Sequence, residues 1–287
     1  MTKPLVTIVI PVYNQYGYTR RCLESVRELD YTEVETLVVD NGSSDGTSTL
    51  LAKEFPWVRV IRSETNLGYA GGCNRGMRES RGEYILLLNN DTWIVDRDLL
   101  MVLSRALADD PRIAAAGPRI VDYDDPSRIL FDGERDAVGY LDIAGVVLLL
   151  RRAALEEVGL FDESFFAYYE DRDLFARVRK AGWSLRHVPT VRVAHRGSAT
   201  AVSGSAFYYR WHNRNLVIFL RRYATLRNLL LRVLPTWTPA TVWSLKSLLG
   251  RHDREGLQSW ILGYWEGIRS ALSDQPTSWP SLPARPP

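Results

Sequence analysis

The chain has 287 residues, of which 46% are hydrophobic and 24% charged, an ordinary balance for a soluble globular protein that excludes wholesale disorder. A net charge of +2 argues against a generic nucleic-acid binder, so no nucleic-acid partner is expected. Neither the number nor the spacing of the two cysteines, Cys22 and Cys73, indicates a disulfide scaffold or a zinc site, which favours the reducing cytoplasm.

The N-terminal segment, MTKPLVTIVIPVYN, has too short an apolar stretch and no small-residue cleavage site for a signal peptide. It is typical of a first β-strand instead. No uninterrupted apolar run approaches the roughly 20 residues that are needed to span a bilayer. Any membrane contact is therefore expected to be peripheral, at the inner face of the cell membrane.

Short β-branched runs alternate with helical patterns in the first part of the chain. The predicted strands are 6–12, 36–39, 58–61, 84–88 and 113–116, and the predicted helices are 18–29, 47–53, 70–80 and 97–108. Strands separated by helices of this length imply right-handed crossovers and a mostly parallel sheet. The fold class is therefore α/β, with a nucleotide-binding type of architecture in the first half.

The later elements are less regular. Residues 142–150 form a continuous apolar run that predicts a buried strand, and helices are predicted over 151–158 and 170–181, the latter ending before Gly182. The small and polar residues of 196–206 predict a mobile loop.

Long helical stretches rich in Leu, Arg and Trp follow Phe207. One apolar stripe among them either packs on the main domain or lies in a membrane interface. It is made of Leu226, Leu229, Leu230 and Val233. The predicted division of the chain is 1–222 for the main domain, with halves 1–120 and 121–222, then 223–272 for a helical extension and 273–287 for a disordered tail.

The segment YILLLNNDT ends an apolar run with Asn89, Asn90 and Asp91. A strand of an open α/β sheet that ends this way places oxygen ligands at the ligand-binding edge. Such ligands suit Mg²⁺ or Mn²⁺, and either cation can clamp a diphosphate. The segment predicts a nucleotide diphosphate site, although a polar turn explains it equally well.

Two further segments follow predicted strands or open a helix. VVDNGSSDGT places Asp40 where a carboxylate can accept the N3–H of a uracil or thymine ring, although turn chemistry explains it too. NLGYAGGCNRG brings four glycines to a helix start, which permits close approach of a phosphate. The glycine spacing matches neither a dinucleotide-binding fingerprint nor a P-loop.

Adjacent acids, Glu170 and Asp171, follow the aromatic run FFAYY. Neighbouring helical residues point about 100° apart, so one acid can face a cleft and remove a proton from a sugar hydroxyl. Acids at a helix N-terminus are also common because of the helix dipole. His195, after the strand-like VRVA, could complete a metal site with Asp91, although a lone histidine is more often structural.

These segments, in this order, resemble an inverting family 2 glycosyltransferase with the GT-A fold, and within it the rhamnosyltransferase-like members that use nucleotide-sugar donors. The resemblance runs from about Val6 to Arg222. It is carried by VTIVIPVYNQ, VVDNGSSDGT, NLGYAGGCNRG, YILLLNNDT, the segment from DIAGVV to KAGW, AHRGSAT and YYRWHNRN. It implies a metal-dependent hexosyltransferase of cell-surface polysaccharide synthesis, with a mostly parallel sheet flanked by helices and a helical C-terminal extension.

The resemblance also implies roles for individual residues. Asp171 would be the catalytic base, with Glu170, Tyr169 and Trp183 in supporting or acceptor-binding roles. Asp91 and His195 would hold a divalent cation, Mg²⁺ or Mn²⁺. The donor would be bound by Pro11, Tyr13, Asp40, Asn66, Gly71, Gly72, Asn74, Asn90, Arg210, Arg214 and Asn215.

One departure from the family pattern concerns the metal motif. Many relatives carry two or three acids there, whereas Asn89 and Asn90 are neutral, which predicts a looser dependence on the cation. The expected partners are a dTDP- or UDP-sugar, with dTDP-rhamnose favoured, and a glycan or lipid-linked acceptor. A sugar nucleotidyltransferase and a non-catalytic carbohydrate-binding protein remain as alternatives.

Overall fold

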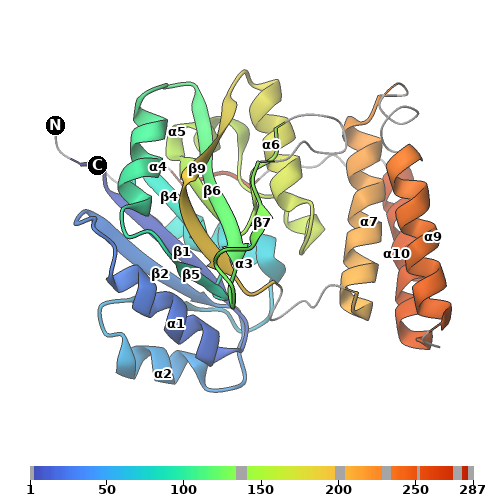
Figure 1. The fold of residues 1–287 in the computed structure, drawn as a ribbon, viewed down its shortest axis with the longest axis horizontal. Helices are drawn as coiled ribbons and strands as arrows, with labels where there is room; N and C mark the ends of the chain where they lie inside the picture. The colour runs from blue at the N-terminus through green and yellow to red at the C-terminus, as the bar shows by residue number, and fades with distance from the viewer. Residues whose placement is uncertain are drawn as a thin grey trace.

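The protein is an α/β domain with long helices packed at one side, as Figure 1 shows for the computed structural model. The structure describes residues 3–133, 141–197, 204–225, 227, 234–250, 253–273 and 280–283. The stripe of Leu226, Leu229, Leu230 and Val233 lies outside these residues, as does most of the loop predicted at 196–206.

The strands form one sheet in the order β3-β2-β1-β4-β8-β6-β9-β5, with β7 paired to β6. Their bounds are β1 Val6–Val12, β2 Val34–Asp40, β3 Arg59–Arg62, β4 Tyr84–Leu88, β5 Thr92–Ile94, β6 Ile113–Asp122, β7 Ile129–Phe131, β8 Val147–Arg151 and β9 Ser184–His195. The pairings of β1 with β2 and β4, of β2 with β3 and of β6 with β9 are parallel, whereas β5, β7 and β8 run antiparallel to their neighbours. The predicted mostly parallel sheet is confirmed.

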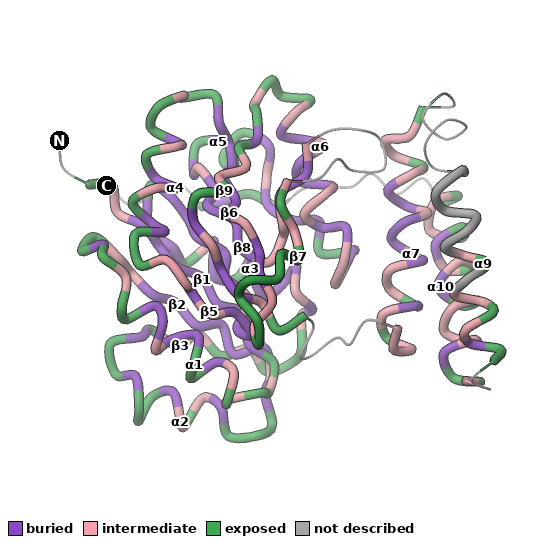
Figure 2. The backbone as a smooth tube through the Cα atoms, in the orientation of Figure 1, coloured by how far each residue is buried: buried purple, intermediate pink, exposed green. Residues whose placement is uncertain are grey.

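Helices cover both faces of the sheet. Their bounds are α1 Tyr16–Arg27, α2 Thr47–Glu54, α3 Gly68–Glu79, α4 Leu99–Ala108, α5 Arg152–Val158, η1 Glu163–Phe165, α6 Glu170–Lys180, α7 Ala206–Tyr223, α9 Leu234–Gly250 and α10 Arg254–Leu272. One hydrophobic core lies under α1, α2 and α4, and the other lies under α3, α5 and α6. Every residue of β1 is buried because the strand is covered from both sides, and Figure 2 shows this central band in purple.

The strand predicted over 142–150 begins only at Val147. The residues before it leave the ladder: Asp142 pairs with Arg172 at 3.2 Å, and Gly145 lies against Asp171 of α6. An apolar run therefore continues as a strand only where a partner strand is available, and here β4 supplies that partner from Val147 onwards.

The helix α7 packs against the loop before α6, through a cluster that includes Phe165, Leu216 and Phe219. The helix α10 in turn packs closely on α7, since a Cβ added at Gly263 or Gly267 would collide with backbone oxygens of α7. Within the described residues, no helix is long and apolar enough to cross a membrane.

Four residues of the predicted tail, 280–283, contact the main domain. Residues 280–283 lie beside the loop after α5, where Leu160 donates its backbone N–H to the carbonyl of Pro280 at 2.8 Å. Leu282 is buried in the core under α5 and α6. Within the described residues, the Leu282 side chain and the Pro280 carbonyl therefore connect this segment to the main domain.

Candidate active site

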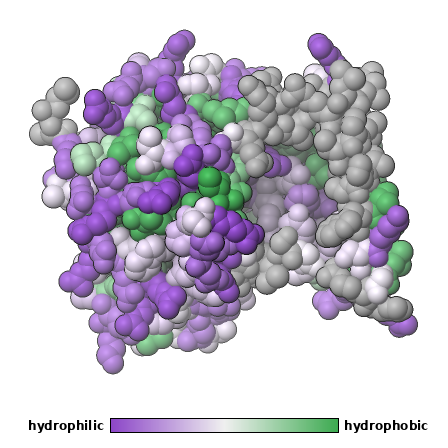
Figure 3. Space-filling model, viewed as in Figure 1, coloured by the Kyte–Doolittle hydropathy of each residue, from purple (hydrophilic) through white to green (hydrophobic). Residues whose placement is uncertain are grey.

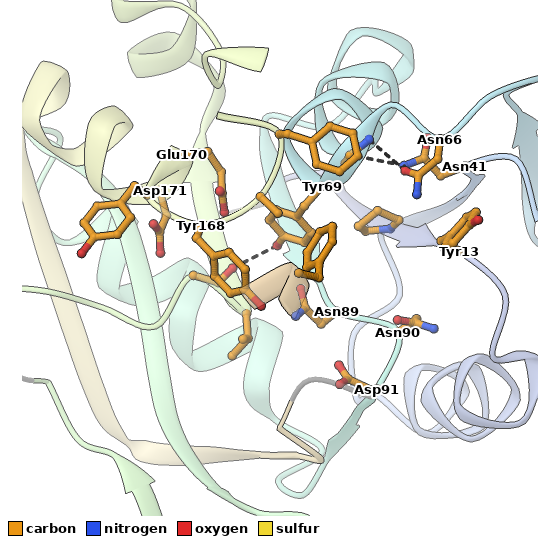
Figure 4. Close-up of a pocket in the computed structure, with 18 of the residues that line it drawn as sticks. Tyr13, Asn41, Asn66, Tyr69, Asn89, Asn90, Asp91, Tyr168, Glu170 and Asp171 are labelled. Atoms are coloured by element: carbon orange, nitrogen blue, oxygen red, sulfur yellow. Dashed lines mark hydrogen bonds between the residues drawn. The ribbon is translucent and has the colours of Figure 1, made fainter. Parts of the chain in front are cut away.

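A cavity of about 370 Å³ opens at the carboxyl ends of β1, β2 and β4, where open α/β sheets bind their ligands. Three groups of side chains face it in Figure 4. The first follows β1 and β2, the second follows β4, and the third begins α6. The predicted site residues that line it are Pro11, Tyr13, Asn66, Asn90, Asp91, Tyr169, Glu170, Asp171 and His195.

The first group forms a shallow shelf between Tyr13, which is 37% exposed, and Asn66. Asn41 fixes this shelf, because its amide donates to Asn66 Oδ1 at 3.1 Å and to the carbonyl of Gly68 at 2.9 Å. Asn41 Oδ1 also accepts the backbone N–H of Leu67 at 3.0 Å. The start of α3 is thereby held against the end of β2, and an exposed aromatic ring is left for a flat ligand to stack on.

The second group brings Asp91 and His195 together. The pairing of β5 with β9 sets His195 opposite Thr92, so that His195 Nε2 lies 3.2 Å from Asp91 Oδ1. Asn89 Oδ1, which is also buried, has no hydrogen-bond partner within the described residues. A buried carboxylate, an imidazole nitrogen and an amide oxygen are ligands that Mn²⁺ and Mg²⁺ accept, so these residues fit the implied cation.

The protein supplies few acids to that cation. No group of three or more His, Cys, Asp or Glu side chains that could hold a metal occurs in the described part of the chain. The neutral Asn89 and Asn90 stand beside Asp91. A cation bound here would need additional oxygen ligands, and a diphosphate provides such oxygens.

The third group is the acid pair at the start of α6. Burial and the charge of Asp171 raise the pKa of Glu170 well above its ordinary value. Burial also raises the pKa of Asp171, but the charge of Arg172 and its backbone N–H, 2.7 Å from Asp171 Oδ1, oppose this. Glu170 therefore holds its proton more tightly, and Asp171 is the acid that ionises first.

Glu170→Gln is expected to raise the thermal midpoint at neutral pH. Since the folded-state pKa of Glu170 lies above its unfolded value, its contribution to stability is present in acid and is lost as pH rises through the folded-state pKa. Glutamine cannot ionise, so the gain over wild type should disappear below the ordinary glutamate pKa of about 4.3. Thermal unfolding across pH measures this, and a difference that does not vary with pH would contradict it.

A glycine makes room for the carboxylate of Asp171. A Cβ added at Gly145 would overlap Asp171 Oδ2. The hydroxyl of Tyr69 donates to the carbonyl of the same glycine at 3.1 Å, which fixes this backbone beneath the acid pair. Only glycine at this position leaves Asp171 in its place.

If Asp171 is the predicted base, Gly145→Ala should displace it and lower turnover about 100-fold, since small displacements of a reacting group cost that much, with little change in binding of the predicted donor. Steady-state kinetics measure both quantities. Gly17→Ala in α1 is the matched control, because a Cβ there meets nothing within 4 Å. Equal activity of the two variants would show that Asp171 tolerates displacement.

The loop before the acid pair has a strained backbone. Phe166, Tyr168 and Tyr169 have φ angles of 61°, 69° and 72°, a region that costs side-chain-bearing residues about 1–3 kcal/mol each. Asn215 of α7, which is fully buried, donates its amide to the carbonyls of Phe165, Ala167 and Tyr168 at 2.7 to 2.9 Å. A side chain from α7 thereby holds the loop that presents Asp171.

The other predicted donor-binding residues of the first half lie outside the cavity. The carboxylate of Asp40 is fully buried, where it accepts the backbone N–H of Ser43 at 2.8 Å and pairs with Arg62 at 2.9 Å. Asn74 exchanges two hydrogen bonds with the backbone of Phe161. Gly71 and Gly72 permit close packing of α3, and a Cβ at Gly72 would stand 3.2 Å from Asn41 Nδ2.

The remaining predicted residues also form framework contacts. Trp183 donates its indole N–H to Glu157 at 2.8 Å, away from the acid pair. Arg210 pairs with Glu266 of α10 at 2.7 Å. Arg214 donates to the carbonyl of Ser164 at 2.9 Å. In this arrangement neither arginine faces the cavity, and both connect α7 to its neighbours.

Sequence patterns gave no role to several residues that line the cavity. Asn41, Tyr69 and Gly145 lie within segments that the family resemblance already quoted, so the segment carried the signal although the residue did not. His212 and Phe207 come from α7, whose approach to the cavity depends on tertiary packing. Burial lowers the pKa of His212 to about 4, which leaves it neutral beside Arg172.

The sequence matches known glycosyltransferases. The family described as Glycosyl transferase family 2 matches residues 7–158, just over half of the chain. N-acetylglucosaminyl-diphospho-decaprenol L-rhamnosyltransferase of Mycobacterium tuberculosis is 30% identical over 264 aligned positions, covering 75% of this chain and 85% of that protein. Poly-beta-1,6-N-acetyl-D-glucosamine synthase of Staphylococcus epidermidis is 25% identical over 173 positions, 55% of this chain and 42% of that protein.

Solved structures share the fold. The mannosyltransferase PcManGT of Pyrobaculum calidifontis, in complex with GDP-Man and Mn²⁺, matches with a TM-score of 0.64 and 19% identity over 96% of this chain and 89% of that one. GalNAc-T7 with UDP, GalNAc and Mn²⁺ matches with a TM-score of 0.61 and 16% identity over 78% and 52%. These similarities favour a glycosyltransferase over the nucleotidyltransferase and the non-catalytic binder. The chain belongs to glycosyl transferase family 2, and it is a glycosyltransferase with the GT-A fold.

Proposed function

We propose that the protein is an inverting, divalent-cation-dependent hexosyltransferase that moves a sugar from a nucleotide diphosphate to a hydroxyl of a lipid-linked acceptor in cell-surface polysaccharide synthesis. One observation carries the proposal. The pair Asp91 and His195 and the pair Glu170 and Asp171 line the same cavity, so a donor diphosphate and an acceptor hydroxyl can meet there. The cavity is also continuous with the shelf at Tyr13, which can take the nucleobase.

Asp91 and His195 would hold the cation, with Asn89 or Asn90 beside them. When bound, the cation neutralises negative charge on the donor diphosphate, which makes the nucleoside diphosphate a better leaving group. Tyr13 and Pro11 would stack against the base and ribose, and Asn66 would contact the donor from the start of α3. These residues fix the donor so that its anomeric carbon faces the acid pair.

Asp171 would act as the general base. As the acceptor oxygen forms its bond to the anomeric carbon, its proton passes to the carboxylate of Asp171, and the bond from that carbon to the diphosphate oxygen breaks. A single displacement of this kind inverts the anomeric centre. Glu170, which keeps its proton more tightly, would donate a hydrogen bond to the acceptor, and Tyr169 would support it.

The relatives suggest the identity of both substrates. The Mycobacterium tuberculosis relative is named as a rhamnosyltransferase that acts on N-acetylglucosaminyl-diphospho-decaprenol. The corresponding proposal for this chain is a dTDP- or UDP-sugar donor, with dTDP-rhamnose favoured, and a polyprenyl-diphosphate-linked glycan as acceptor. The reaction would then take place at the cytoplasmic face of the membrane, where the enzyme would be peripheral.

A donor screen tests the proposal. The protein is incubated with dTDP-, UDP- and GDP-sugars, with and without Mn²⁺, while the thermal midpoint and the release of nucleoside diphosphate are followed. A cognate donor is expected to raise the midpoint through mass action. It should also release nucleoside diphosphate slowly as its sugar is transferred to water. Stabilisation by nucleoside triphosphates and none by any nucleotide sugar would count against the proposal.

A further inference from the structure

The helix α10 has two opposite faces of different character. Gly256, Gly263 and Gly267 lie on one face, and added Cβ atoms there would collide with neighbouring atoms, two of them with backbone oxygens of α7. At 100° per residue, the opposite face carries a stripe of large apolar side chains. They are Ile261, Leu262, Trp265, Ile268 and Leu272, which are 44% to 79% exposed.

The charged side chains within this stripe are basic. Viewed down the helix axis, Arg254 and Arg269 fall within the arc that the apolar side chains occupy, and Arg269 lies 5.1 Å from the ring centre of Trp265. The nearest acids, Glu255 and Glu266, fall beyond its edge, and Glu266 is already paired with Arg210. On α9, Val242, Lys246 and Leu249 repeat the pattern on one exposed face. Figure 3 shows hydrophobic surface (green) at the edge of the molecule where these helices lie.

The charge of the whole chain is divided unequally. Residues 204–273 hold ten Lys and Arg against three Asp and Glu, a net charge of +7. Since the complete chain carries +2, the remaining residues carry −5. The helical part is therefore drawn toward an anionic surface that the catalytic domain does not favour.

We propose that the exposed face of α10, joined by that of α9, docks on a bilayer that contains anionic phospholipid. The apolar side chains would enter the boundary between headgroups and acyl chains, where Trp265 is well suited, and the arginines would meet lipid phosphates. The helix would lie along the surface, because no helix among the described residues is apolar enough to cross it.

The position of the cavity agrees with such docking. The helix α7 packs on α10 with one side and brings Phe207 and His212 to the cavity with the other. Docking of α10 would keep the acceptor side of the cavity close to the membrane. This step rests on the proposed function, because it matters only if the acceptor is anchored in lipid.

A second copy of the chain fits this face less well. In a two-fold symmetric dimer the same face meets itself, so Arg254 and Arg269 of both copies would be buried together. No carboxylate within the arc could neutralise them, since Glu255 and Glu266 lie outside it. Like charges brought together without a counter-charge oppose association, whereas an anionic bilayer supplies the counter-charge.

Vesicle co-sedimentation of the full chain tests the docking. The vesicles are phosphatidylcholine alone or phosphatidylcholine mixed with phosphatidylglycerol, at low and high salt. We expect the wild type to bind the anionic vesicles about tenfold more tightly, with the difference reduced by salt. A double variant, Trp265→Ser with Ile268→Ser, should lose about tenfold or more in binding. Met101→Ser on α4, where Met101 is 43% exposed, is the matched control.

Three readings separate the outcomes. Loss of vesicle binding in the double variant, with an unchanged thermal midpoint, supports the proposal. The proposal is overturned if the double variant binds as well as the wild type, or if the wild type does not bind. It is also overturned if the wild type is a dimer that the double variant converts to a monomer, because the face would then belong to a second copy. Donor hydrolysis without vesicles is measured in parallel. It should be the same in both proteins, so a failure of the glycosyltransferase proposal would be recognised separately.

Discussion

Asp171→Asn is expected to lower turnover by about 100- to 10,000-fold, the usual contribution of a general base, while donor binding stays nearly unchanged. The amide keeps the shape of the side chain and the backbone N–H of Arg172 still has an oxygen to bond, so α6 should begin in the same way. What is lost is the ability to take a proton from the acceptor hydroxyl. Steady-state kinetics and calorimetric titration with the donor measure the two effects.

Two controls separate this result from a loss of folding. Asp98→Asn makes the same chemical change at an exposed residue that precedes α4, where the side chain makes no cap hydrogen bond. It should leave turnover and binding unchanged. The pH profile gives a further test, because burial raises the pKa of Asp171, so the ascending limb of turnover should lie above the ordinary aspartate range. Equal losses of binding and turnover in Asp171→Asn would contradict the assignment of the base.

Asp91→Asn is expected to lower turnover on the order of 100-fold and to raise the Mn²⁺ concentration needed for half-maximal activity. Within the described residues, Asp91 is the acid that lies against His195, and its neighbours after β4 are the neutral Asn89 and Asn90. Without that charge, the cation would meet only the amides of Asn89, Asn90 and the new asparagine and the imidazole of His195. Neutral groups of this kind bind a hard cation weakly. Titration of Mn²⁺ into activity assays and into donor-binding assays measures the change.

The same titration distinguishes a metal ligand from a structural residue. Asp96, which lies two residues after β5, is paired with Arg192 at 2.9 Å and does not line the cavity. Asp96→Asn should therefore affect the thermal midpoint more than the Mn²⁺ dependence. If Asp91→Asn retained wild-type activity at every Mn²⁺ concentration, Asp91 would not be a ligand, and the cation would have to be held elsewhere.

The first half of the fold was largely predictable from the sequence. The bounds predicted for β1 and β4 are those observed, because both strands are buried on both faces, and the apolar run of β4 is bounded by Glu83 and Asn89. The segment 142–150 was predicted less well. Its apolar run reads as one strand, but the first residues leave the ladder to pass beneath Asp171, which only the tertiary structure determines.

Some residues of the candidate site could likewise be placed from the sequence, and others could not. Residues directly after predicted strands, such as Tyr13 and Asp91, were placed correctly at the sheet edge because the strand end fixes their position. Asp40 also follows a strand, but its side chain turns toward Arg62 and the loop of Ser43. Residues of α7 could not be placed, since Asn215 bonds to carbonyls 47 to 50 positions away.

The proposed reaction is a single displacement at the anomeric carbon with Asp171 as the base. Proton NMR of the reaction mixture tests it most directly, because the anomeric proton of the first product reports the configuration before any slow equilibration. We expect a product whose anomeric configuration is opposite to that of the donor, formed by the wild type and Asp98→Asn and not by Asp171→Asn. A product of retained configuration, or one formed equally fast by Asp171→Asn, would contradict it.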